Sequence, residues 1–428
     1  MCRRTAGRDP QSMRKAARRE GSYRAALAVP EFRVIFAAAT VNITGSVVCA
    51  VALTVLVFER TRSPLLSALT FALGFVPYVF GGTLLSGIVD RVPPRRLLVC
   101  CFLGSAGLTA VMAIPRLPVP ALLLLLIATS TLTSVSSGAQ GALVRSAVPE
   151  ATYVPARSLL RIASQLAQVV GNAFGGLLLV VLTPSGAIAV DSVALVASAL
   201  LLRFGLRHRP VAGVQDGTGL VRDSLRGLRL VLAQPAVRRL VLLGWLVPMF
   251  SVAPEALAAP YVVGKGGSPA LVGWWLVALP TGMIAGDLLG VLRLSPQLQR
   301  RLVGLLAAAS FVPYLAFAVR PAIGVAWILL AASGVCGMYS LGLDGLVRQA
   351  VPEHLFARTM AISSAGLMTL QGLGFALAGA VGQLAGPATA ILAAGICGIA
   401  CVALLRPRAT DLPGRAAPTE VTPAAVGQ

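Results

Sequence analysis

The sequence contains few charged residues for its length. Asp, Glu, Lys and Arg together make up 12% of the 428 residues, whereas apolar residues make up 57%, and the mean hydropathy is +0.83. A water-soluble domain has about a quarter of its residues charged. The composition therefore excludes an ordinary soluble domain and indicates a chain that lies largely in lipid.

Residues and motifs that enzymes use are also scarce. The two histidines, His208 and His354, lie in expected loops, and the seven cysteines include no CxxC pair. Most of the cysteines fall inside apolar runs, where a thiol behaves as a small apolar group. The sequence has no HExxH, GxSxG or GxxxxGK[ST] pattern. We therefore expect a protein that is not an enzyme, with no disulfide framework, metal or cofactor.

Long apolar runs dominate what is present. A helix needs about 20 mainly apolar residues to cross the hydrocarbon core of a bilayer. The first run is too long for the apolar segment of a signal peptide, so we expect an uncleaved span. The sequence predicts an all-α integral membrane protein with twelve transmembrane helices, at residues 32–58, 65–89, 97–114, 120–144, 158–182, 187–204, 239–262, 270–292, 302–319, 322–346, 361–384 and 388–405.

The basic residues are concentrated on one side of these spans. Lys and Arg number 36 against 15 acids, which gives a net charge of +21. With the amino terminus inside, only five of them fall in outer loops, namely Arg60, Arg62, Arg116, Lys265 and Arg320. Because cytoplasmic loops carry the excess of Lys and Arg, we expect a multi-pass plasma-membrane protein with both termini in the cytoplasm. The expected partners are the lipid bilayer and a small molecule, with no nucleic acid, and the chain is expected to be a monomer.

One eight-residue phrase occurs twice. LVRSAVPE at 143–150 and LVRQAVPE at 346–353 agree in seven of eight letters and lie 203 residues apart. Each copy follows an expected span, and at the same offset Gln168 aligns with Gln371. Repeats of the same orientation are related by an axis along the membrane normal. We therefore expect two six-helix bundles related by pseudo-two-fold symmetry.

The repeat divides the chain into five segments. Within the segment that joins the bundles, Val221, Leu225, Leu228 and Leu232 recur at helical spacing, which predicts an amphipathic helix on the inner leaflet or against the bundle. The expected segments are a cytoplasmic basic arm, an N-terminal bundle, a cytoplasmic linker, a C-terminal bundle and a cytoplasmic disordered tail, at 1–31, 32–204, 205–236, 237–405 and 406–428.

The chain resembles the major facilitator superfamily of secondary transporters in its two six-helix halves, its long central loop and the segment SGIVDRVPPRRLL. The resemblance covers about residues 25 to 406. An acid at the cytoplasmic end of a helix can hold nearby arginines in a contact that breaks when the halves rock. The alternative is that these arginines serve topology alone. The expected conformational latch consists of Asp90, Arg91, Arg95 and Arg96.

A glycine-rich segment, VVGNAFGGLL, lies in the fifth expected span. In exporters of this superfamily a Gly-Pro pair followed by Gly-Gly marks this helix, and here Asn172 stands at the proline position. Glycines four residues apart let two helices approach closely. The resemblance implies that spans five and eight pack across the interface between the halves. We therefore expect inter-bundle packing at Gly171, Gly175, Gly176, Gly282, Gly286 and Gly290.

The resemblance also implies that spans one, four, seven and ten line a central cavity. Most hydroxyls of span four are expected to bond their own preceding carbonyls. The wall formed by these spans is apolar and aromatic with few polar points, which suits a bulky amphipathic compound rather than a sugar. The candidate substrate contacts are Asn42, Gln140, Trp245, Phe250 and Tyr339.

Two acids are candidates for proton coupling. Glu255 has no basic residue within a helical turn, and an ionised acid in hydrocarbon costs several kcal/mol, so it is expected to face the cavity or take up a proton. The alternative is a carboxylate satisfied by neighbours near the outer surface. Asp191 lies near the outer end of span six, within reach of water or a hydroxyl. Two further acids are expected to form simple ion pairs, Asp287 with Arg293 and Asp344 with Arg348.

Together these features predict an exporter of a small amphipathic compound, a drug or a secondary metabolite, that works by alternating access as a proton antiporter. A two-fold repeat with a long linker favours rocking halves over a static channel. Uptake of a charged metabolite would need a basic residue in the cavity, and Arg161, near the cytoplasmic end of span five, is the single candidate. The remaining alternative is an uptake permease for a small neutral metabolite.

Overall fold

The computed structural model describes residues 23–84, 92–206, 235–351 and 353–405. In this part of the chain every regular element is a helix. Eleven helices or helix groups are long and apolar enough to cross a membrane, and α4 supplies the twelfth expected span. The predicted all-α membrane fold is therefore confirmed. The amphipathic helix predicted within 221–232 and the predicted tail at 406–428 lie outside the described residues.

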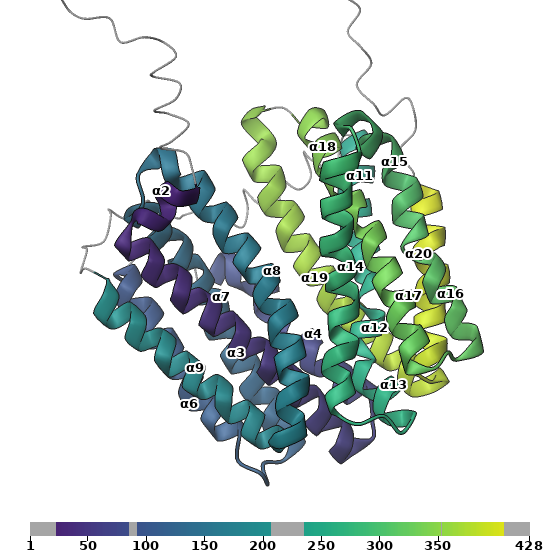
Figure 1. Ribbon diagram of the computed structural model, residues 1–428, viewed down its shortest axis with the longest axis horizontal. Coiled ribbons are helices and arrows are strands. Elements are labelled where there is room, and N and C mark those ends of the chain that lie inside the picture. The colour runs from purple at the N-terminus through teal and green to yellow at the C-terminus, as the bar shows by residue number, and fades with distance from the viewer. Residues whose placement is uncertain (1–22, 85–91, 207–234, 352, 406–428) are drawn as a thin grey trace, which may run out of the picture.

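The first six spans form one bundle, the N-terminal half, shown in purple to teal in Figure 1. Within the described residues each of these spans is a single unbroken helix. Four of them begin with proline, which fits the first turn because its missing N–H would have no intrahelical partner there. The helices are α2 (Tyr23–Ala28), α3 (Pro30–Thr61), α4 (Pro64–Leu84), α6 (Pro94–Met112), α7 (Val119–Ala147), α8 (Glu150–Val181) and α9 (Pro184–Gly205).

The other six spans form the C-terminal half, in green to yellow. Three of them, spans seven, nine and ten, are each divided into shorter helices. The elements are α11 (Pro235–Ser251), α12 (Ala253–Ala256), α13 (Ala258–Gly264), α14 (Ala270–Arg293), α15 (Pro296–Ala309), α16 (Val312–Leu315), the 3₁₀ turn η1 (Ala316–Val319), α17 (Ile323–Val335), the 3₁₀ turn η2 (Cys336–Met338), α18 (Tyr339–Ala350), α19 (Glu353–Ala385) and α20 (Pro387–Leu405).

The breaks in the C-terminal half have local causes. A proline inside a helix lacks the N–H for the ladder and clashes with the carbonyl four residues back. Span seven contains Pro248, Pro254 and Pro260, and span nine contains Pro313. In span ten the break is the 3₁₀ turn η2, a tighter winding that often marks a strained or functional point.

The duplicated phrase marks equivalent turns in the two halves. α7 ends at Ala147 and α8 begins at Glu150, while α18 ends at Ala350 and α19 begins at Glu353. Val148 and Val351 are both extended, as expected for a residue that precedes proline. The repeated Val-Pro-Glu therefore ends one span and starts the next at corresponding places.

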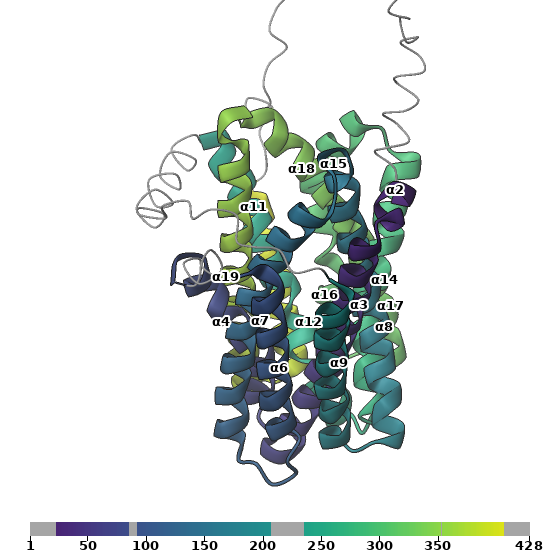
Figure 2. The ribbon, with the colours of Figure 1, turned by 90° about the vertical axis from the view of Figure 1, so that its left-hand side faces the viewer.

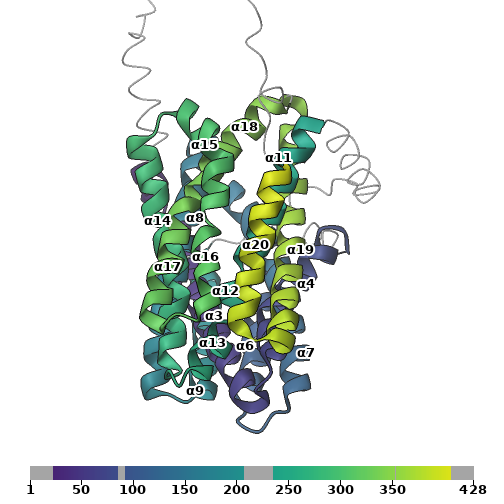
Figure 3. The same ribbon diagram turned by 90° about the vertical axis from the view of Figure 1, so that its right-hand side faces the viewer.

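The two halves lie apart at the upper end of Figure 1, where α2 is found, and meet at the lower end. Figures 2 and 3 show the spans of each half side by side along the length of the molecule, and in Figure 1 those of the N-terminal half are inclined to those of the C-terminal half. Most of the contact between the halves is made by two helix pairs, α4 with α19 and α8 with α14. In the first pair the ring of Phe375 stacks on Phe71 and Phe75, with centroids 5.1 and 5.7 Å apart. Nearer the lower end the Ser63 hydroxyl donates to Oε1 of Gln383 at 2.8 Å.

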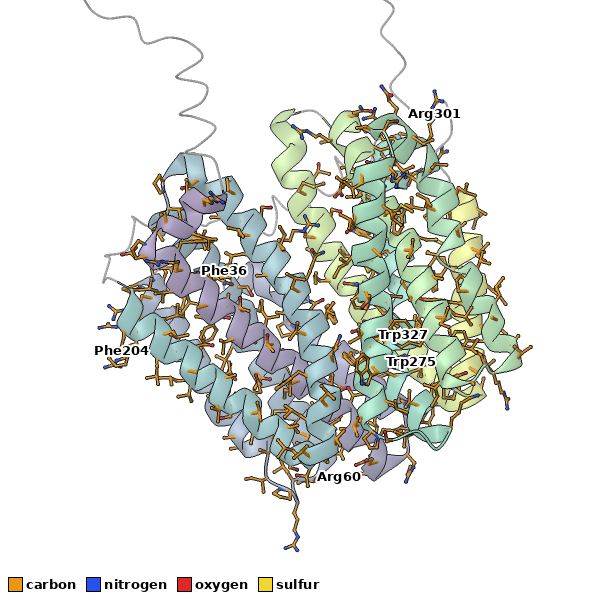
Figure 4. The ribbon with its side chains drawn as sticks, viewed as in Figure 1. Phe36, Arg60, Phe204, Trp275, Arg301 and Trp327 are labelled. Atoms are coloured by element: carbon orange, nitrogen blue, oxygen red, sulfur yellow. The ribbon has the colours of Figure 1, made fainter. Side chains whose placement is uncertain are left out.

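Apolar side chains cover the outer surface as well as the core. One buried cluster extends from α3 and α4 into the C-terminal half, so the two halves share part of their core. Phe204, labelled in Figure 4, points outward from the end of α9 and is 79% exposed. Exposed apolar side chains of this kind on a membrane-spanning helix face the lipid tails.

Candidate functional site

A cavity of about 550 Å³ lies between the two halves. Its walls come from α3, α4 and α8 on one side and from α11, α12, α14, α17, η2, α18 and α19 on the other. This volume is in the range of sites that enclose a drug-sized ligand. The apolar part of the wall includes Phe71, Leu279, Met283, Ile284 and Leu367.

Amide side chains supply much of the polar lining. Gln165, Gln168 and Asn172 come from α8, and Gln371 comes from α19. None of the four was predicted as a ligand, although the internal repeat pairs Gln168 with Gln371, and the structure brings both to one cavity from opposite halves. Asn172 also donates its amide N–H to the carbonyl of Leu276 at 3.3 Å, which links α8 to α14.

Glu255 lines the cavity at the break of span seven, in the short helix α12. Its side chain is half-buried, and among the described residues that line the cavity there is no Lys, Arg or His. Nearby, the Tyr314 hydroxyl donates to the carbonyl of Ser251 at 3.0 Å. A carboxyl group in this position can hold a proton or balance a cationic group on a bound molecule.

Asp191 lies inside the N-terminal half, away from the cavity. It lies on α9, is 5% exposed, and packs against α3 beside the thiol of Cys49. Its Oδ1 has no hydrogen-bond partner among the described groups. A Cβ on Gly45 would lie 2.7 Å from that oxygen, so the glycine permits the approach. The expectation that Asp191 reaches water or a hydroxyl is wrong, because α3 covers the face of α9 that carries it.

Two more acids lie in the C-terminal half. Asp287 lines the cavity and Asp344 is exposed on α18. The basic residue whose charge acts on both is Arg161 of α8, in the N-terminal half. The predicted ion pairs with Arg293 and Arg348 are therefore wrong, because neither arginine is among the charges that act on these carboxylates. In the described residues no three His, Cys, Asp or Glu side chains could together hold a metal ion.

Two of the five predicted substrate contacts lie in pockets. Tyr339 lines the central cavity, and Gln140 lines a second pocket within the N-terminal half. The prediction for most hydroxyls of span four is confirmed. They bond carbonyls three or four residues earlier in α7, and they belong to Thr129, Thr131, Thr133, Ser136 and Ser137.

The other three predicted contacts, Asn42, Trp245 and Phe250, are not among the residues that line the cavity. The indole N–H of Trp245 donates to the carbonyl of Ser363 at 2.8 Å, and its ring lies against Gly366 of α19. Phe250 packs against the buried cluster of the C-terminal half. The side chain of Asn42 is half-buried on α3. Neighbouring helices therefore occupy the faces that Trp245 and Phe250 present.

Only one of the six predicted glycines packs across the halves. A Cβ on Gly176 would lie 2.5 Å from the carbonyl oxygen of Ala270 and 3.0 Å from Cα of Gly273, both in α14. Gly171 and Gly175 instead pack against α3 in their own half. At these two positions the predicted inter-bundle packing is wrong, because that face of α8 is turned toward span one.

The three predicted glycines of α14 also pack within their own half. A Cβ on Gly282 would lie 2.0 Å from the carbonyl oxygen of Ala331, and one on Gly286 would lie 2.1 Å from that of Val335. Gly290 meets Met338 and Leu341. The three therefore pack against span ten in their own half, and the predicted inter-bundle role is wrong for them as well.

The predicted latch is described in part. Asp90 and Arg91 lie outside the described residues. The guanidinium of Arg95 donates to the carbonyl of Arg203 at the end of α9, within the same half, and Arg96 is exposed. A cation at a helix carboxyl end is favourable because it opposes the helix dipole. The latch itself stays a prediction.

Comparisons with known proteins agree with this architecture. A family model described as Major Facilitator Superfamily matches residues 35–339. The multidrug efflux pump Tap of Mycolicibacterium fortuitum is 25% identical over 407 residues, which cover 90% of this chain and 97% of that protein. The enterobactin exporter EntS of Salmonella typhimurium is 26% identical over 390 residues, covering 88% and 91%. The solved structure of nucleoside transporter NupG superposes with a TM-score of 0.72 at 13% identity, covering 88% of this chain and 98% of that one.

Proposed function

Because this chain belongs to the major facilitator superfamily, and is therefore an integral membrane transporter and not an enzyme, we propose that it exports a small amphipathic compound, a drug or a secondary metabolite, as a proton antiporter. The observation that carries the proposal is the position of Glu255. It is a half-buried carboxyl group on the wall of a cavity between the halves, and no described lining residue is basic.

The lining supports an amphipathic substrate. Aromatic and aliphatic side chains from both halves bury an apolar body, while Gln168, Asn172 and Gln371 offer hydrogen bonds from fixed directions. Pockets of this kind bind through buried apolar area and use a few polar groups to orient the ligand. Tap and EntS, which resemble this chain along most of its length, are an efflux pump and an exporter.

The mechanism that we propose is alternating access. The chain crosses the membrane twelve times, so both termini lie on one side, and the distribution of Lys and Arg favours the cytoplasm for that side. The halves are separated at that end in the present conformation and joined at the other by α4 with α19 and α8 with α14. Rocking about the cavity would part these two pairs and bring the cytoplasmic ends together.

Glu255 couples the proton to this motion in our proposal. An ionised carboxylate that is closed off from water without a cation costs several kcal/mol, whereas the protonated form does not. The halves would therefore rock when Glu255 holds a proton or when a bound compound satisfies it. Exchange of one for the other gives export of the compound against entry of a proton.

The test is accumulation of a panel of amphipathic drugs in an efflux-deficient bacterial host that expresses the chain. We expect lower accumulation than in the empty host, and we expect the difference to vanish with a protonophore and in Glu255→Gln. The matched control is Glu59→Gln, an exposed acid at the outer end of α3 that lies outside the cavity lining.

Two results would change the proposal. If the protonophore abolishes export but Glu255→Gln does not, the chain is a proton-driven exporter with another coupling residue, and Asp191 is the next to replace. If the chain raises accumulation of small neutral metabolites and lowers that of no drug, the uptake permease is the better description.

A further inference from the structure

A second pocket, of about 530 Å³, lies entirely within the N-terminal half. It is formed by α3, α7 and α8, and no described residue of the C-terminal half lines it. Its polar wall consists of Ser137, Gln140, Arg157, Ser158, Arg161 and Ser164. The described lining contains two cationic side chains and no acid. The described lining of the central cavity has the opposite charge, with two acids and no basic residue.

The two arginines are held close together. Arg157 and Arg161 lie one turn apart on α8, so their side chains leave the same face of the helix. Both are exposed to the pocket. Nη1 of Arg157 lies 3.7 Å from where a Cβ on Gly141 would be, so its guanidinium reaches across the pocket to α7.

The remainder of the wall is apolar. Ile43 of α3, Val144 of α7 and Leu160 of α8 face the same space. Guanidinium groups bind carboxylate, sulfonate and phosphate oxygens through paired, charge-assisted hydrogen bonds. We propose that this pocket binds an amphipathic anion, whose charged group lies between Arg157 and Arg161 while its apolar body packs against these three side chains.

The pocket and the central cavity share α8 as a wall. Arg157, Arg161, Gln165, Gln168 and Asn172 follow one another at spacings of four, four, three and four residues, so they share one face of the helix. The first two line the second pocket and the other three line the cavity. The anion site is therefore placed at the cytoplasmic entrance of the proposed path. It does not depend on the coupling role proposed for Glu255.

A competing partner for Arg161 lies across the opening. The charges of Asp287 and Asp344 in the C-terminal half act on it, although no ion pair joins these three described residues. Closure of this end could bring the acids to Arg161 with no ligand involved. The experiment has to separate an anion site from a contact between the halves.

The test uses the full chain in nanodiscs of phosphatidylcholine and two probes, naphthalene-2-sulfonate and the neutral naphthalene-2-sulfonamide, titrated by calorimetry. The sulfonate should bind the wild type, and Arg157→Gln and Arg161→Gln should each weaken it by about tenfold, because each removes a charged hydrogen-bond donor. Sulfonamide affinity should not change in either variant. Arg301→Gln is the matched control, since Arg301 is exposed at the same end and lies outside the pocket (Figure 4).

Three outcomes would overturn the site. Equal weakening by Arg301→Gln would mean that the sulfonate is attracted only by the net positive charge of the chain. Sulfonate binding that neither Arg157→Gln nor Arg161→Gln weakens would show that these arginines do not bind the sulfonate. Drug export that is lost in Arg161→Asp and restored by adding Asp287→Arg, with sulfonate binding unchanged in Arg161→Gln, would assign Arg161 to the contact between the halves.

A further arm identifies the source of the anion. Phosphatidylglycerol is added to the nanodiscs, and retained lipid is measured by native mass spectrometry. The site is assigned to a lipid headgroup if the lipid displaces the sulfonate and is retained by the wild type but not by the double variant Arg157→Gln/Arg161→Gln. Sulfonate binding that the lipid does not compete with would assign it to a free amphipathic anion.

Discussion

Gly176→Ala should shift the balance between the present conformation and the alternate one that we propose. The added methyl group would lie 2.5 Å from the carbonyl oxygen of Ala270 and 3.0 Å from Cα of Gly273, both in the opposite half. These are backbone atoms, so neither can rotate away as a side chain would. The clash exists only while α8 and α14 are in contact, and it disappears when this end of the molecule opens.

The size of the shift follows from the cost of overpacking, which is about 1 to 3 kcal/mol for one extra methyl group in a well-packed site. A free-energy difference of that size changes the ratio of two conformations by about 5-fold to 150-fold. Gly171→Ala is the matched control on the same helix. Its methyl group would lie 2.8 Å from Cβ of Val47, within one half, so it strains both conformations alike.

The assay is a spin-label distance measurement by double electron–electron resonance. Labels are placed at Arg116 and Gly324, exposed positions in opposite halves at the end where the halves meet, after replacement of the seven native cysteines. We expect Gly176→Ala to add a population at longer distance and Gly171→Ala to leave the distribution as in the wild type. The reasoning is refuted if both variants lose stability to the same extent and neither changes the distances.

Two further substitutions test packing within a half. Gly286→Ala should lower the thermal unfolding temperature clearly, because its Cβ would lie 2.1 Å from the carbonyl oxygen of Val335, whereas Gly324→Ala meets no atom within 4 Å and should have no such effect. Equal unfolding temperatures for Gly286→Ala and Gly324→Ala would contradict the close packing of α14 on span ten. Thr70→Val should cost about 1 kcal/mol of unfolding free energy, because it leaves the buried Thr54 hydroxyl without its 2.8 Å partner, and adding Thr54→Val should recover most of the loss. Denaturant unfolding in detergent measures both, and a double variant no more stable than Thr70→Val would contradict the pairing.

The spans could be predicted because membrane insertion imposes one simple rule, a sufficient length of apolar chain. The predicted ends were less accurate where a helix continues beyond the lipid. α8 begins at Glu150 rather than 158, and α19 begins at Glu353 rather than 361. In both cases the first two turns are polar, so hydropathy does not detect them, although helical hydrogen bonding continues there.

The site was less predictable because a helical pattern assigns residues to a face without naming the neighbour on that face. Glu255 and Tyr339 do line the cavity. Trp245 is on the expected span, but α19 covers its ring. The glycines of α14 have the spacing for close approach, but the helix they meet is span ten rather than α8. Pairing of this kind depends on how the whole bundle assembles.

The breaks in spans seven, nine and ten give the two halves different mechanical properties. An unbroken helix transmits a displacement along its whole length, as a rod does, and all six spans of the N-terminal half are of this kind. A helix interrupted at mid-membrane can change the direction of one end while the other stays still. A state closed at both ends then requires bending in one half only. The sequence repeat relates the two bundles, yet the interruptions are confined to the second, and Glu255 lies in the short helix at one of them.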